Sequence, residues 1–281
     1  MENNSQKQAG DRTARDRRQR VQSASIGMLV LKELAALGGR ATLTALAAHL
    51  HENPAKVHRY LASLMEESFV TQDGETQQYC LGPQCISIGL AAMRVADPIR
   101  LSEPSLVRLR ESLEVTCFIA VMGNHGPTII RFEEPGLPVT VNVRAGSVMS
   151  LLWSATGRLF LALLDESRVR KLAKEELARA PADLRALLDP TDPIGQLQRE
   201  VRAMGCATVK DTNLKGISAV SAPLFDANGH LCASLTALGA TGGFDSSIDG
   251  PIATALRKEA ETISAALGYV PDHANAFSGC V

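Results

Sequence analysis

The sequence predicts an α+β protein with two domains, a small helical one at the N-terminus and a larger one built on a single antiparallel sheet. The chain has 281 residues, about twice the roughly 150 residues of an average domain. Its N-terminal third shows helical periodicity and then two short strands, and the rest reads as strands, helices, strands and a final helix. That order is typical of an α+β layer fold.

The predicted organisation has five parts. They are a basic disordered tail over 1–22, a helical domain over 23–85, a linker helix over 86–100, the larger domain over 101–270 and a C-terminal tail over 271–281.

The composition is that of a globular protein, with 45% hydrophobic and 21% charged residues and a net charge of -1. Only the segment 1–22 is clearly basic, with six Lys or Arg against three acids. It is either a solvated leader or an arm laid along phosphates.

Two apolar stretches, 26–37 and 151–164, are interrupted by charged residues, so neither is expected to span a membrane. The first 22 residues are polar and lack the apolar centre of a signal peptide. The sequence therefore predicts a cytoplasmic protein without membrane partners.

The six cysteines do not form paired clusters with the spacing of a structural zinc site. Cys117, Cys206 and Cys232 lie in apolar, strand-like runs, where a thiol acts as a small hydrophobic group. No metal site and no cofactor are expected.

Three helices are expected in the N-terminal domain. Apolar residues recur at three- and four-residue steps from Ile26 to Leu37, before a Gly-Gly stop. Thr42 is a candidate N-cap for a short helix over 43–50. Asn53 is the candidate cap of a third helix, with Pro54 at its first position and Val57, Leu61 and Leu64 facing inward. A short helix, a tight turn and a longer helix form a helix-turn-helix in outline.

A hairpin is expected directly after the third helix. Two short strands, 69–71 and 78–81, flank the polar turn 73–75, which makes the hairpin a wing. On the third helix, donor side chains that can reach phosphate oxygens or purine edges lie opposite the apolar face. The candidate DNA-binding residues are Thr42, Thr44, Asn53, Ala55, Lys56, His58, Arg59 and Tyr60.

The charge of this domain leaves an alternative open. Residues 23–82 hold four Lys or Arg against six acids, a balance of -2. A helical bundle with a charged outer face can also be a protein-binding module, so periodicity alone does not decide between DNA and protein as the partner.

The larger domain begins with a helix over 104–114. A meander of strands is expected next, at 116–122, 128–133 and 139–144, and then helices at 151–164, 166–178 and 193–204. Strands at 207–210, 217–225 and 230–238 and a helix over 251–267 complete the domain.

Several of these segments resemble motifs of the IclR family of bacterial transcriptional regulators, in the family's order. Residues 57–61, VHRYL, resemble its V-H-R-L-L, and residues 79–82, YCLG, resemble its Y-x-L-G. Residues 144–146, RAG, and 154–158, SATGR, resemble its G and T-A-x-G-K elements, and residues 216–223, GISAVSAP, resemble its G-x-x-C-x-A-A-P.

This resemblance implies a winged helix-turn-helix followed by an effector-binding domain similar to the GAF and PAS sensors. It also implies a homodimer or homotetramer that binds double-stranded operator DNA. The chain departs from the pattern ahead of V-H-R, where Pro54, Ala55 and Lys56 stand in place of K-S-T. Lys56 can there replace a hydroxyl contact to phosphate with a charged one.

The resemblance, with two residues near its motifs, Trp153 and Asp211, gives the candidate effector-binding residues. They are Trp153, Ala155, Thr156, Val209, Asp211, Ala219, Thr236 and Leu238. The family's cysteine falls on Ala219, and its usual acidic position falls near Val209 and Lys210.

Such a lining is more apolar than one suited to a very small oxoacid, which needs several donors to offset its lost hydration. The expected effector is therefore an aromatic or partly apolar organic acid, held by shape and by Thr156 and Thr236 as polar contacts. Both threonines could instead be core residues, and Trp153 could equally line the pocket mouth or pack in the core or an interface.

The function expected from these observations is a DNA-binding regulator of a metabolic or catabolic operon, controlled by a small-molecule effector. One alternative is an enzyme that uses the same pocket, with the N-terminal bundle as a docking module. No G-x-S-x-G element, phosphate loop or metal-ligand spacing supports it, and Asp211 lacks a nearby base, so no catalytic residue is expected. A protein-interaction adaptor is a further alternative.

Overall fold

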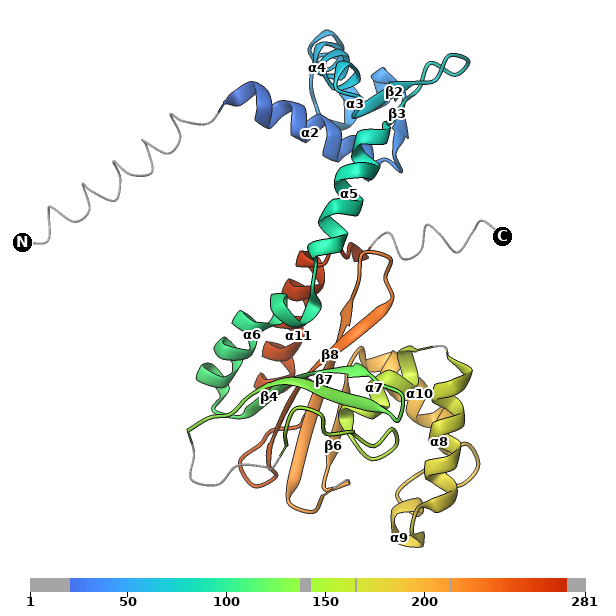
Figure 1. The fold of residues 1–281 in the computed structure, drawn as a ribbon, viewed down its shortest axis with the longest axis vertical. Coiled ribbons are helices and arrows are strands. Elements are labelled where there is room, and N and C mark those ends of the chain that lie inside the picture. The colour runs from blue at the N-terminus through green and yellow to red at the C-terminus, as the bar shows by residue number, and fades with distance from the viewer. Residues whose placement is uncertain (1–20, 137–142, 165, 213, 272–281) are drawn as a thin grey trace, which may run out of the picture. The chain divides into compact units, whose positions relative to one another are not determined.

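The computed structural model describes residues 21–136, 143–164, 166–212 and 214–271. The chain divides between Val95 and Ala96 into two compact units. Figure 1 shows the elements of each unit. No helix in the described ranges is long and apolar enough to cross a membrane.

The first unit contains the three predicted helices. They are α2 (Gln22–Ala36), α3 (Leu43–His49) and α4 (Pro54–Glu66). Both predicted N-caps are confirmed, since the Thr42 side chain accepts from Ala45 N–H at 3.2 Å and Asn53 Oδ1 accepts from Ala55 N–H at 2.9 Å. Val57, Leu61 and Leu64 of α4 are buried, as their spacing predicts.

The wing is present as β2 (Val70–Gln72) and β3 (Tyr79–Leu81), paired antiparallel. A two-residue strand that the sequence did not predict, β1 (Arg40–Ala41), pairs with the other edge of β3. Gly82 follows β3 where the chain passes close to the end of α4. A β-carbon at this position would lie 2.3 Å from the Ser68 carbonyl oxygen, which explains the glycine.

The expected linker helix is α5 (Pro83–Val95), which begins and ends earlier than the predicted 86–100. It ends because Asp97 caps the next helix, α6 (Pro98–Leu113), by accepting from Ile99 N–H at 2.9 Å. No residue of α5 is buried within the structure.

The second unit contains one antiparallel sheet in the order β5-β4-β8-β7-β6. Its strands are β4 (Thr116–Met122), β5 (Pro127–Glu133), β6 (Ala207–Lys210), β7 (Ile217–Phe225) and β8 (Leu231–Ala240). Of the expected strand over 139–144, residues 139–142 lie outside the described residues, and Val143 and Arg144 are not in a strand.

The helices of this unit follow the predicted order. After α6 they are α7 (Ala155–Leu163), α8 (Ser167–Arg179), α9 (Ala182–Arg185), α10 (Pro193–Met204) and α11 (Pro251–Ala266). The short α9 was not predicted, and α7 begins at Ala155 rather than 151. Ser154 caps α7 by accepting from Gly157 N–H at 2.9 Å.

The motif around this cap packs tightly against the preceding turn. A β-carbon on Gly157 would lie 1.8 Å from the Ser150 carbonyl oxygen, so only glycine fits. Arg158 Nε donates to the Leu152 carbonyl at 2.8 Å. The motif therefore fixes the first turn of α7 relative to the turn before it.

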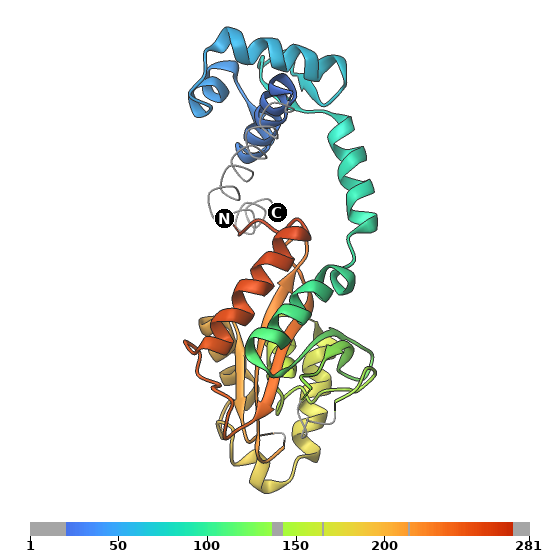
Figure 2. The same ribbon diagram turned by 90° about the vertical axis from the view of Figure 1, so that its left-hand side faces the viewer.

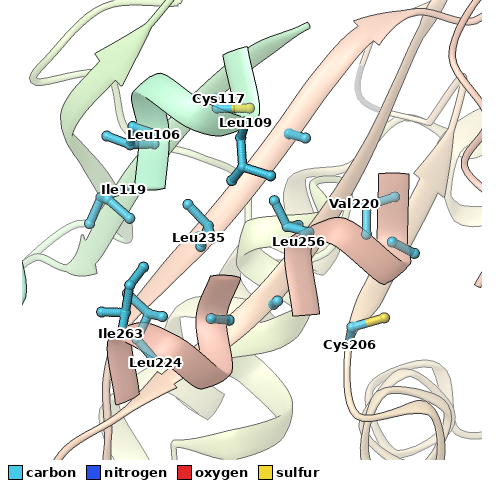
Figure 3. Close-up of a cluster of buried hydrophobic side chains, with 14 of the residues drawn as sticks. Leu106, Leu109, Cys117, Ile119, Cys206, Val220, Leu224, Leu235, Leu256 and Ile263 are labelled. Atoms are coloured by element: carbon cyan, nitrogen blue, oxygen red, sulfur yellow. The ribbon is translucent and has the colours of Figure 1, made fainter. Parts of the chain in front are cut away.

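Both faces of the sheet are covered. On one face, α6 and α11 lie side by side (Figure 2) and pack on a cluster that includes Cys117, Ile119, Leu235 and Leu256 (Figure 3). The other face contributes Phe118 and its alternating neighbours to a cluster with α7 and α10. Burial raises the pKa of Cys117 to about 12, so this thiol stays protonated at neutral pH and acts as a core residue.

Candidate functional site

The outer face of α4 is the candidate DNA interface. Ala55, His58 and Arg59 are exposed on it, opposite the apolar face that packs on α2 and α3. The imidazole and the guanidinium can both donate to phosphate oxygens or to base edges in a major groove. Thr44 is exposed on α3.

Two of the predicted DNA-binding residues also cap the helices. The Thr42 hydroxyl and the Asn53 amide oxygen each accept a backbone hydrogen bond. The hydroxyl hydrogen of Thr42 and the amide N–H₂ of Asn53 are not used by these caps. Both side chains thus place hydrogen-bond donors at helix N-termini, where anions are favoured.

Lys56 and Tyr60 make contacts within the first unit that the sequence did not predict. Lys56 Nζ donates to Glu52 Oε1 at 2.6 Å, so an acid one turn earlier partly neutralises this cation. Tyr60 is half-buried in the cluster between the helices, close to Gly27 of α2. Phosphate binding by Lys56 therefore competes with an existing ion pair.

The wing tip carries negative charge. Asp73 Oδ1 accepts from Thr76 N–H at 2.7 Å, from the Thr76 hydroxyl at 2.8 Å and from Glu75 N–H at 3.0 Å. These hydrogen bonds hold the pKa of Asp73 below its usual range. An ionised carboxylate shapes the turn, so the wing tip itself is a poor phosphate contact.

The candidate effector site is a cavity of about 190 Å³ between the first turn of α7 and the sheet. Six of the eight predicted residues line it: Ala155, Thr156, Val209, Ala219, Thr236 and Leu238. The structure adds seven that the sequence did not indicate: Phe118, Val143, Ser147, Met149, Ser154, Leu214 and Ile217.

The lining contains no ionisable side chain among the described residues. Its polar groups are backbone atoms and the hydroxyls of serine and threonine. The cavity can therefore enclose an apolar body and hydrogen-bond one polar group. Its described lining offers no acid or base that could activate a hydroxyl as a nucleophile. No group of three or more His, Cys, Asp or Glu in the described ranges is placed to hold a metal ion.

Three buried hydroxyls form a hydrogen-bonded chain at the wall of this cavity. Thr156 Oγ1 lies 2.9 Å from Thr236 Oγ1, which lies 2.9 Å from Ser221 Oγ. Thr156 and Thr236 belong to the lining, whereas Ser221 does not. The two predicted polar contacts of the pocket are thus hydrogen-bonded to each other.

The structure does not bring Trp153 or Asp211 into the cavity. Trp153 belongs instead to a separate buried cluster that includes residues of α8 and α10. Asp211 adopts φ 56°, and its Oδ1 accepts from Gly216 N–H at 2.7 Å and from the Thr241 hydroxyl at 2.9 Å. Its carboxylate ties the ends of β6, β7 and β8 together and is not a lining group.

Strand alternation could have identified one of the missed residues. Phe118 pairs with Thr236 across β4 and β8, and directly paired residues share a face of the sheet. Met149 and Leu214 lie in loops, for which the sequence carries no comparable signal.

A larger hollow of about 610 Å³ lies between α8 and α9. Its polar wall residues, Lys174, Arg185 and Asp189, are all exposed. It is therefore an open groove without buried polar groups, and the smaller cavity is the better ligand site.

Two family models match the chain. The model of the bacterial transcriptional regulator IclR C-terminal domain matches residues 90–265, and that of the IclR helix-turn-helix domain matches residues 23–74.

Individual proteins are similar over most of the chain. The HTH-type transcriptional regulator BhcR of Paracoccus denitrificans is 26% identical over 213 residues, 76% of each chain. The acetate operon repressor of Salmonella typhimurium is 24% identical over 223 residues, 78% of this chain and 80% of the repressor. The crystal structure of Pseudomonas aeruginosa HmgR is 38% identical and superposes with a TM-score of 0.82, covering 89% of this chain and 100% of HmgR.

Proposed function

The chain belongs to the IclR family of bacterial transcriptional regulators, and from this premise we propose that it controls a metabolic or catabolic operon in response to an aromatic or partly apolar organic acid. The first unit binds operator DNA and the second unit binds the effector. Two relatives are named as a transcriptional regulator and as an operon repressor, which supports control of this kind. Because a regulator must reach its operator DNA, we propose that the protein acts in the cytoplasm.

The observation that carries the effector class is the uncharged cavity beside α7. Phe118, Met149 and Leu214 give it apolar walls, while Thr156 and Thr236 supply hydroxyls at one side. A ring or branched chain gains by covering those walls. A two- or three-carbon oxoacid carries the same carboxylate but has no apolar body to cover those walls, so less offsets its lost hydration.

Operator binding is assigned to the exposed donors of α4 and to the two capping side chains. A single winged helix buries too little surface for tight specific binding, so the binding unit is a homodimer or a dimer of dimers on a pseudo-palindrome. The unburied helix α5 supplies an apolar surface for this association, with Ile86, Leu90 and Met93 at 66%, 49% and 50% exposure.

Calorimetric titration of the full-length protein tests the effector class. Benzoate and phenylacetate are compared with glyoxylate and pyruvate under the same conditions. We expect heat of binding from the aromatic acids and a change in DNA affinity at the same concentrations. Binding of the small oxoacids, with none of the aromatic acids, would contradict the proposal.

Footprinting on the DNA beside the protein's own gene tests the regulator. Two protected half-sites related by inversion are expected. Arg59→Ala should weaken binding by roughly 1–3 kcal/mol if the guanidinium contacts a base. Arg185→Ala, which removes an exposed arginine of the second unit, is the matched control and should leave the affinity unchanged.

A further inference from the structure

Burial restricts the direction of the hydrogen bonds among the three hydroxyls at the cavity wall. Ser221, Thr236 and Thr156 are buried, and each carries one hydrogen. Among the described residues, Ser221 Oγ has Thr236 Oγ1 as its hydrogen-bond partner. If Ser221 accepted this bond, its own hydrogen would be buried without an acceptor, which is unfavourable. Ser221 is therefore the donor to Thr236.

One of the two remaining hydroxyl hydrogens is then available to the cavity. Thr236 passes its hydrogen either to Thr156, 2.9 Å away, or directly to the cavity that both threonines line. In the first case Thr156 is left with a hydrogen for the cavity. In both cases the O–H dipoles of Ser221 and Thr236 have their positive ends on the cavity side.

From this geometry we infer that Ser221, which does not line the cavity, is a positioning residue that makes the site selective for an anionic acceptor group, a carboxylate. The inference rests on the effector site proposed above and deepens it. An anion gains from every aligned dipole in the chain, because charge–dipole attraction extends beyond the first contact in a low-dielectric interior. A neutral amide of the same shape gains mainly from the hydroxyl that it touches.

The sequence of β7 is consistent with such a role. Ala219 stands where the motif G-x-x-C-x-A-A-P has cysteine, and Ser221 stands where it has the first alanine. Both residues lie on one face of β7, because they are two apart and pair with Leu238 and Thr236 of β8. On this face of β7, the chain therefore carries a polar side chain at Ser221, two residues after the position at which the motif has cysteine.

Paired probes separate this role from a merely structural one. Phenylacetate and phenylacetamide share a ring and a spacer and differ in charge. Calorimetry of the full-length wild type should give an affinity about tenfold higher for the acid. In Ser221→Ala, the acid should bind about threefold more weakly while the amide is unchanged, since one aligned dipole is lost.

Substitutions of Thr236, the central residue of the three, should have a larger effect and allow a conservative rescue. Thr236→Val removes the link between Ser221 and Thr156, so the preference for the acid should fall to near unity. Thr236→Ser keeps the hydroxyl and should retain most of that preference. A valine variant with the wild-type preference would overturn the inference.

Ser218→Ala is the matched control. Ser218 is also a buried serine of β7, and its Oγ lies 3.0 Å from a threonine hydroxyl, that of Thr241, but neither residue lines the cavity. The ratio of the affinities for phenylacetate and phenylacetamide in Ser218→Ala should equal that of wild type. An unchanged ratio in Ser221→Ala, an equal change in Ser218→Ala, or a wild type that does not prefer the acid would each refute the role of Ser221.

Operator release, measured separately by fluorescence anisotropy, distinguishes this inference from the proposed function. Acid binding that depends on Ser221 but leaves DNA affinity unchanged would contradict effector control, while the role of Ser221 in the binding site would still be supported. Acid-dependent release that is insensitive to Ser221 would refute only the positioning role.

Discussion

Lys56 Nζ lies 2.6 Å from Glu52 Oε1, across the Asn53 cap of α4. Each of these side chains is about one-third exposed, at 34% and 37%, so the pair is partly shielded from solvent. It places an acid within the candidate DNA interface. A phosphate contact by Lys56 would require the lysine to give up this carboxylate.

Glu52→Gln should therefore strengthen DNA binding, because it frees Lys56 and removes a negative charge near the phosphates. The slope of log affinity against log salt should steepen by about 1, the value for one additional phosphate contact. Fluorescence anisotropy on a labelled duplex in a salt series measures this slope. Glu175→Gln, at an exposed position of the second unit, is the control, and equal slopes in both variants would show that Glu52 does not restrain Lys56.

A charge in the middle of α5 should break the proposed dimer. Leu90→Glu places a carboxylate in an apolar surface, so the dimer must bury it unpaired or dissociate. Sedimentation velocity at micromolar concentration is expected to give a dimer or tetramer for wild type and a smaller species for the variant. The control, Leu187→Glu, changes a leucine of the second unit that is 58% exposed, against 49% for Leu90. The dimer interface would lie elsewhere if only the Leu187 variant dissociates.

Ala219→Asp should abolish effector binding and spare DNA binding. The new carboxylate would lie in the uncharged cavity beside Val209 and Leu238, where an unpaired charge costs several kcal/mol and repels an acid. Affinity for an aromatic acid should fall by on the order of a hundredfold. Ala178→Asp, on the exposed side of α8, serves as the control for added charge. Retained acid binding in Ala219→Asp would place the ligand outside this cavity.

Gly157→Ala should destabilise the second unit. Its new methyl would overlap the Ser150 carbonyl, a backbone atom that can move only with the whole turn. Overpacking of this kind costs about 3 kcal/mol, which scanning calorimetry detects as a lower melting temperature. Gly242→Ala, where nothing lies within 4 Å of the new β-carbon, should melt close to wild type. Equal melting temperatures for the two variants would mean that the turn at Ser150 moves to accommodate the methyl group at little cost in stability.

The elements that the sequence predicts well depend on local interactions. Thr42 and Asn53 cap their helices within three residues, and the apolar face of α4 follows from helical spacing alone. The two-residue β1 has no such signal, because it forms only where β3 offers a free edge. Strands this short are specified by tertiary contacts.

The candidate sites show the same limit. Positions on regular elements, such as Ala219 on β7 and Thr236 on β8, could be assigned to the pocket from the sequence. Trp153 could not be placed, because its direction depends on a turn packed under α8. The pairing of Lys56 with Glu52 crosses a helix cap, where side-chain direction is not given by helical periodicity.

The two faces of the sheet can be engineered independently. Alternate residues of β4 belong to separate clusters, with Cys117 and Ile119 packed toward α6 and α11, and Phe118 toward the cavity. Substitutions in groups that share no contacts have nearly additive effects on stability. A biosensor made from this chain could therefore gain thermal robustness from changes around Leu256 and then be retuned for a new analyte around Phe118, without one round of selection undoing the other.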